Sequence, residues 1–255
     1  MAIQENPYLP PQSRVADAVI AAGGYIDGGR AVPAAHAWDW ITTGWQIFRR
    51  QSGSWVLLTI VLGLITVVLG VIPIVSLSVS LLMPIFIGGL MLGCRKIEKG
   101  DDIELADLFS GFKHSGGALV LVGLIGLGLT IAAVIPASIM VALSGFFGAA
   151  SGGIASMGVG FIVGMLLFTA LLVPVYMALW FAPALVALQG QSATQAVAQS
   201  FRGCVRNILP FLAYSVILMV LAIVATIPLM LGWLVLAPVL IASVYAAYRD
   251  IYFDQ

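Results

Sequence analysis

Three long runs without charge constrain the fold of this 255-residue chain more than any other feature. Residues 51–94, 114–201 and 207–248 contain no Asp, Glu, Lys or Arg. A helix needs about 20 apolar residues to cross the hydrocarbon core of a bilayer, so the runs hold about two, four and two span lengths. Only 9% of the residues are charged, against about 25% in soluble domains. We therefore predict an all-α, polytopic membrane protein.

The runs divide into about six transmembrane helices. The middle run also contains a glycine-rich stretch at 144–157 and a polar stretch at 189–200, which leaves room for two long spans. Pro73 and Pro228 fall where the first and third hairpins are expected to turn. We place the spans near 55–73, 77–94, 116–142, 158–186, 209–230 and 232–248.

The distribution of basic residues predicts the orientation. All 11 Lys and Arg precede the first span, lie between the second and third or the fourth and fifth, or follow the sixth. Loops rich in Lys and Arg stay in the cytoplasm. We therefore expect a multi-pass protein of a bacterial inner membrane, with its N- and C-termini both cytoplasmic.

The first 33 residues differ in composition from the rest. They are rich in Gly, Pro, Ala and polar residues and begin without the apolar core of a signal peptide. We predict a flexible cytoplasmic tail at 1–33 and a six-helix membrane domain at 34–255. The NPYLPP stretch within the tail is either an extended docking peptide or simply part of the tail.

A pattern repeats three times along the membrane domain. A Phe followed by a basic residue precedes each predicted hairpin, at Phe48-Arg49, Phe112-Lys113 and Phe201-Arg202, and a proline lies early in each returning helix, at Pro84, Pro174 and Pro238. We predict three hairpin repeats, each preceded by an interfacial amphipathic helix. The prolines are candidate hinges or the walls of a crevice, because each frees a backbone carbonyl. The alternative is that they only shape helix packing.

The amphipathic stretches carry aromatic residues at helical spacing, as interfacial helices do. Trp38, Ile41, Trp45 and Phe48 share one helical face. The predicted interfacial anchors are Trp38, Trp45, Phe48, Phe112, Phe201 and Arg202, and the same role is expected for Trp40, Trp55, Tyr245, Tyr248 and Tyr252. A ligand-binding aromatic cage is the alternative for the tryptophans and tyrosines.

Three stretches resemble a known family: AWDWITTGWQIFRRQ, LLMPIFIGGLMLGCRKIEKG and DLFSGFK. They are similar to six-span bacterial inner-membrane proteins with a domain of unknown function. More distantly, they are similar to YciC-type proteins and to the membrane domain of some glycerophosphodiester phosphodiesterases. The resemblance covers roughly 30–255 and implies the location and a helical fold, but no activity.

Motifs for catalysis, cofactors and metals are missing from the sequence. No ionisable residue falls within the predicted spans, Cys94 and Cys204 form no C-x-x-C pair, and His36 and His114 are far apart. The acidic cluster Asp101, Asp102, Glu104 and Asp107 is either a cation site or, through Asp101 or Asp102, a helix cap. We therefore expect neither an enzyme nor a bound cofactor or metal.

Two functions remain open. The first is a non-catalytic membrane or envelope factor that handles lipids or assists the assembly of membrane proteins. The second is a permease or channel-like protein for a small neutral or amphipathic solute. The expected partner is the lipid bilayer, with other membrane proteins as further candidates. Nucleic-acid binding is not expected, because the net charge is zero.

Overall fold

The fold is all-α, as the charge-free runs predict. The computed structural model describes residues 24–71, 73–150 and 154–254. Its elements are α1 (His36–Arg50), α2 (Ser52–Val71), α3 (Pro73–Lys99), the 3-10 helix η1 (Leu105–Phe109), α4 (Ser110–Ala150), α5 (Ile154–Trp180), α6 (Ala182–Gln189), α7 (Ala193–Arg206), α8 (Ile208–Thr226) and α9 (Trp233–Tyr252). The one β-type pairing among the described residues is an isolated bridge between Tyr25 and Phe253.

Six helices are long and apolar enough to cross a membrane. They cover Ser52–Val71, Val79–Lys99, Leu105–Phe147, Phe161–Gln189, Ile208–Thr226 and Trp233–Tyr252. These bounds overlap all six predicted spans, so the chain is a multi-pass integral membrane protein. One span is not a continuous helix: α5 ends at Trp180 and α6 begins at Ala182. Between them, the Phe181 amide donates a hydrogen bond to the Ser200 hydroxyl (2.9 Å).

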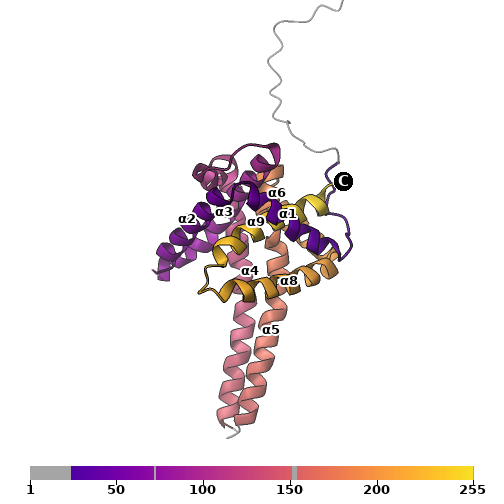
Figure 1. The fold of residues 1–255 in the computed structure, drawn as a ribbon. Helices are drawn as coiled ribbons and strands as arrows, with labels where there is room; N and C mark the ends of the chain where they lie inside the picture. Colours follow the sequence, from indigo (N-terminus) through magenta and orange to yellow (C-terminus); the bar gives the residue numbers. More distant parts are fainter. Residues whose placement is uncertain (1–23, 72, 151–153, 255) are drawn as a thin grey trace, which may run out of the picture.

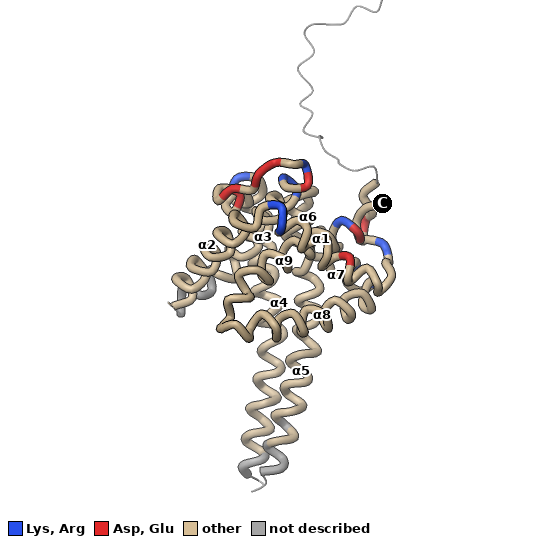
Figure 2. Tube along the Cα trace, in the orientation of Figure 1, with Lys and Arg blue, Asp and Glu red and all other residues tan. Residues whose placement is uncertain are grey.

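The apolar helices form three hairpins, α2–α3, α4–α5 and α8–α9, that diverge from a common region (Figure 1). The α4–α5 hairpin reaches furthest, and α8 runs crosswise to it. The charged residues of the described part of the chain gather on the side opposite the tip of the α4–α5 hairpin (Figure 2). This asymmetry is what a protein needs when one side faces water and the other lies in lipid.

An amphipathic element precedes each hairpin and packs on the returning helix of another. Helix α1 lies against α9, η1 against α3, and α7 against α5 and α6. The middle element is not the regular helix expected around Phe112, because η1 is a 3-10 turn and α4 is kinked at Ser115. The three units thus close in a cyclic arrangement, which fits the predicted triple repeat.

Two of these crossings bring the backbones into contact at a glycine. A Cβ on Gly44 of α1 would lie 2.8 Å from the carbonyl oxygen of Val239 in α9, and a Cβ on Gly111 would meet the carbonyl oxygen of Ile85 in α3. Val239 and Ile85 each follow a proline of the repeat, Pro238 and Pro84. In these two units the proline marks the place where the next amphipathic element crosses.

The described part of the predicted tail, residues 24–33, is attached to the helices. The amide of Val32 donates to Asn207 Oδ1 (2.8 Å), the amide of Arg30 to the carbonyl oxygen of Ile251 (2.8 Å), and Tyr25 stacks on Tyr252 with ring centroids 6.2 Å apart. Residues 24–33 are therefore a strap bound to α7, α8 and α9. The NPYLPP stretch lies outside the described residues.

Candidate functional site

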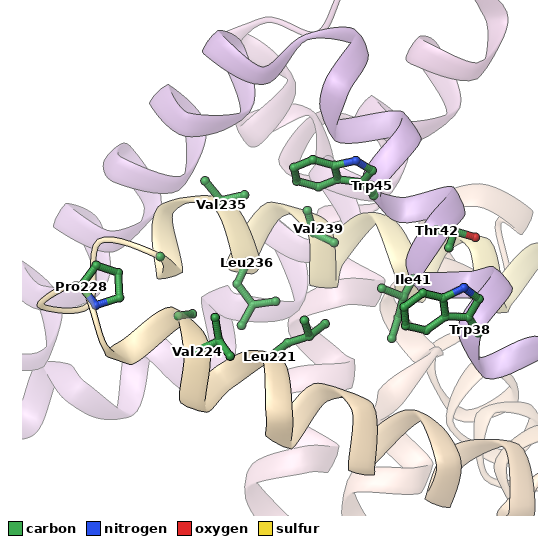
Figure 3. A pocket seen from close by; sticks show the side chains of 12 residues that line it. Trp38, Ile41, Thr42, Trp45, Leu221, Val224, Pro228, Val235, Leu236 and Val239 are labelled. Atoms are coloured by element: carbon green, nitrogen blue, oxygen red, sulfur yellow. The ribbon is translucent and has the colours of Figure 1, made fainter.

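An apolar groove of about 480 Å³ lies between α1 and the α8–α9 hairpin (Figure 3). This volume is within the range of about 300–1,000 Å³ typical of small-molecule pockets. Three helices supply its walls, and Thr42 is the only lining residue with a hydroxyl group. The lining residues are Trp38, Ile41, Thr42, Trp45, Leu221, Val224, Ala225, Pro228, Gly232, Val235, Leu236 and Val239.

Two contacts between α8 and α9 border the groove, one close to the turn and one further along both helices. Close to the turn, a Cβ on Gly232 would lie 2.5 Å from Ala225 Cα, so only glycine permits this approach. Towards the charged side, the buried hydroxyls of Tyr214 and Ser243 are 2.5 Å apart. Between these two contacts the helices separate, and α1 crosses above the gap with Trp38 and Trp45 facing it.

The groove walls combine buried and exposed apolar side chains. Leu236 and Val239 form a buried floor, whereas Val224 is 56% exposed and Trp38 58% exposed. Exposing an apolar surface of this kind to water is unfavourable in free energy, whereas contact with lipid chains is not. Thr42 presents no free donor, because its hydroxyl donates to the carbonyl oxygen of Asp39 (3.0 Å).

A second pocket of about 320 Å³ lies on the other side of α1 and is polar. Its walls include His36, Asp39, Glu98, Arg249 and Asp250. Glu98 is paired with Arg249 and also accepts a hydrogen bond from the Tyr245 hydroxyl (2.6 Å). These contacts join α3 to α9 at the charged side of the protein.

Asp250 is the centre of this polar cluster and is almost fully buried. Its Oδ2 accepts hydrogen bonds from the Trp40 indole (2.8 Å) and contacts His36 Nδ1 (2.8 Å), and its Oδ1 pairs with Arg30 (3.0 Å). The carboxylate thus joins the strap, α1 and α9. The His36–Asp250 contact fastens the first residue of α1 to α9.

Two residues of the acidic cluster at 101–107 cap a helix, but they are not the Asp101 or Asp102 expected from the sequence. Glu104 and Asp107 form a capping box around η1. Asp107 also pairs with Lys96 (2.9 Å), while Asp102 accepts a hydrogen bond from Gln51. Among the described residues, no group of three or more His, Cys, Asp or Glu side chains is placed to hold a metal ion.

The predicted hinge prolines lie outside both pockets. Pro84 is half-buried, Pro174 exposed and Pro238 buried, and none of them lines the groove or the polar pocket. Pro238 is next to the groove through Val239. A crevice built around the three prolines remains a hypothesis, and the contacts at Pro84 and Pro238 fit the packing alternative.

The predicted anchors divide into exposed and buried residues. Trp38, Trp45, Phe112, Phe201 and Arg202 are exposed, as an anchor must be. Phe48 is buried beside Trp45, with ring centroids 5.5 Å apart, so it is not placed to reach lipid headgroups. The wider prediction was also wrong for the residues that form the protein core, namely Trp40, Trp55, Tyr245, Tyr248 and Tyr252.

Sequence reasoning missed the groove and the Asp250 cluster. Both depend on how α1 packs against the third hairpin, which is far away in the sequence. Comparison of the chain with family models, with curated proteins and with solved structures finds no match. The fold and the site define a class, a polytopic α-helical membrane protein with an apolar groove beside α1. The family resemblance stays a prediction.

Proposed function

We propose that this chain is a non-catalytic lipid-handling protein that binds an acyl chain of a membrane lipid in the groove between α1 and α8–α9. The observation that carries the proposal is the groove itself, which is apolar, partly open and bordered by exposed tryptophans. Tryptophan is enriched at the membrane interface, and amphipathic helices such as α1 lie in the headgroup plane. A chain descending from that plane would enter the groove beside Trp38 and Trp45.

The same proposal places the protein in a bacterial inner membrane with both termini in the cytoplasm. Its support is the positive-inside rule applied to the charged side of the protein in Figure 2. Fusions of green fluorescent protein to either terminus should then fluoresce, because that reporter matures poorly when exported through the general secretory route. Dark fusions that are still present in the membrane would contradict the orientation.

Transport of a small solute is less well supported than lipid binding. Both pockets border the amphipathic helix α1, which the proposal assigns to the headgroup plane rather than to the bilayer midplane. A permease site would be expected near the interface between repeats at the bilayer midplane. The groove fits a ligand that arrives laterally from the lipid.

The test is photo-cross-linking with a phospholipid that carries a diazirine on its acyl chain. Val224→Trp should fill the groove, since Val224 lines it on α8. Val216→Trp is the matched control, because Val216 is on the same helix and equally exposed (57%) but does not line the groove. The proposal predicts cross-linked peptides from α1 and α9 in the wild type.

The expected effect of Val224→Trp is a loss of at least about tenfold in cross-linking to α1 and α9, equivalent to about 1.4 kcal/mol of binding. Val216→Trp should leave these yields unchanged. Equal yields in both variants, or cross-links spread evenly over all lipid-facing helices, would refute a specific acyl-chain site.

A further inference from the structure

The turn between α8 and α9 is unusual for a loop that would emerge from a membrane. Residues 227–232 are all apolar or glycine, and Ile227, Leu229, Met230 and Leu231 are 64–90% exposed. A loop in water rarely exposes four large apolar side chains within five residues. The composition favours a turn surrounded by hydrocarbon.

Hydrogen bonds within the turn satisfy most of its backbone donors. The amide of Met230 donates to the carbonyl oxygen of Thr226 (3.2 Å), that of Leu231 to Pro228 (2.9 Å) and that of Trp233 to Met230 (3.0 Å). Leu229 and Met230 adopt left-handed backbone angles (φ 50° and 64°), which are strained for residues with side chains. In lipid such strain costs less than unpaired amides, because the hydrocarbon offers no partner for them.

The polar side chains at the tip are also satisfied internally. The Trp233 indole N–H donates to the Thr226 hydroxyl (3.1 Å), and that hydroxyl donates to the carbonyl oxygen of Ala222 (2.8 Å). A tryptophan at a membrane surface directs its N–H towards headgroups or water. Trp233 instead pairs within the hairpin, as expected for a residue below the interface.

The part of the hairpin between its crossing with α1 and its turn is too short to cross a bilayer. Helix α1 crosses α9 at Val239, where the Gly44 backbone touches it. From Val239 to Gly232 at the turn is seven residues, about 10 Å of helix, whereas the hydrocarbon core is about 30 Å thick. By contrast, α4 continues from its kink at Ser115 to Ala150, about 50 Å.

We propose that α8–α9 is a re-entrant hairpin, which enters the bilayer from the charged side and turns back within the hydrocarbon. The crosswise course of α8 relative to α4–α5 in Figure 1 agrees with a helix that stays in one leaflet. The groove then opens among the acyl chains of the leaflet next to the charged side. This inference requires α1 to lie at the membrane surface, but it does not require the groove to bind lipid.

Cysteine labelling from each side of the membrane tests the proposal. Met230→Cys reports on the turn, Gln46→Cys on the exposed face of α1, and Phe146→Cys on the far end of α4. An impermeant maleimide is added to intact spheroplasts and, separately, to inverted vesicles. The wild type gives the background, because Cys94 and Cys204 are both buried.

We expect Gln46→Cys and Phe146→Cys to be labelled from opposite sides. Met230→Cys should be labelled from neither side, at most about one tenth of its labelling after addition of SDS, because a thiol in hydrocarbon does not ionise. Labelling of Met230→Cys from the Phe146 side would show that the hairpin crosses. Labelling from the Gln46 side would show that it does not enter the bilayer.

A nitroxide attached to the same cysteine gives a second, independent measurement. Collision with oxygen is frequent and collision with a water-soluble nickel chelate is rare when a label lies deep in the bilayer. The proposal predicts both results at residue 230, within the hydrocarbon and at most about 10 Å below α1. A nitroxide found at the depth of the headgroups would overturn the proposal, even if Met230→Cys were protected from the maleimide on both sides. Lipid cross-linking is a separate readout, so either proposal can fail alone.

Discussion

Replacing Asp250 with alanine should destabilise the protein mainly through Trp40. The Trp40 indole is 2% exposed and donates its N–H to Asp250 (2.8 Å). Without the carboxylate this buried N–H has no acceptor, which costs about 1–3 kcal/mol. The Arg30 side chain of the ion pair is partly exposed (32%), so its loss adds about 1 kcal/mol at most. The expected total is about 1–4 kcal/mol of unfolding free energy.

A double-mutant cycle separates these contributions. Phenylalanine at position 40 fills the core but has no N–H, so Asp250→Ala should cost only about 1 kcal/mol in the Trp40→Phe background. The assay is reversible unfolding by SDS in mixed micelles, followed by circular dichroism at 222 nm. The same cost in both backgrounds would refute the assignment of the destabilisation to an unpaired indole N–H.

Three further outcomes follow from the packing. Asn207→Ala removes three hydrogen bonds of a buried side chain, so it should cost about 2–3 kcal/mol and speed protease cleavage at residues 24–33. Gly44→Val should lower the melting temperature, since its Cβ would lie 2.7 Å from Ser243 N, whereas Gly63→Val, with nothing within 4 Å, should change it little. Burial raises the pKa of Cys204 to about 12, so the thiol stays neutral at pH 8, with a thiolate fraction of about 10⁻⁴. Maleimide should react with it only after unfolding, and fast reaction of the folded protein would contradict its burial.

The class of fold was predictable because the energetic rule behind it is simple. Uncharged runs of 42 residues or more cannot remain in water, and hydrogen bonding in lipid leaves helices as the solution. The number of apolar helices followed from length alone. Their directions did not, because α8 is apolar on all sides and its sequence does not specify whether it crosses the bilayer or turns back.

The aromatic residues show where sequence reasoning is limited. Trp38 and Trp40 are two residues apart in α1, and both fit an anchor by composition. In the structure Trp38 is exposed, whereas Trp40 is buried against Tyr214 of the third hairpin. Gly44 was an available signal, because a glycine within an amphipathic stripe marks close helix contact on the face that it shares with Trp40.

The Asp250 cluster and the groove could not be predicted from the sequence for a different reason. Asp250 follows the last span and looks like an ordinary cytoplasmic charge, yet its partner Arg30 is 220 positions away. The groove likewise combines α1 with α8 and α9. One sequence carries no information that pairs such distant segments, so both features required the three-dimensional arrangement.

An experimental structure of the protein in nanodiscs made from native lipids would test the lipid-binding claim most directly. The account predicts an elongated density in the groove, running beside Trp45 and Val235 towards the α8–α9 turn, and its absence in Val224→Trp. A groove closed by its own side chains in the lipid environment, with the same density profile around α8 in both proteins, would contradict acyl-chain binding.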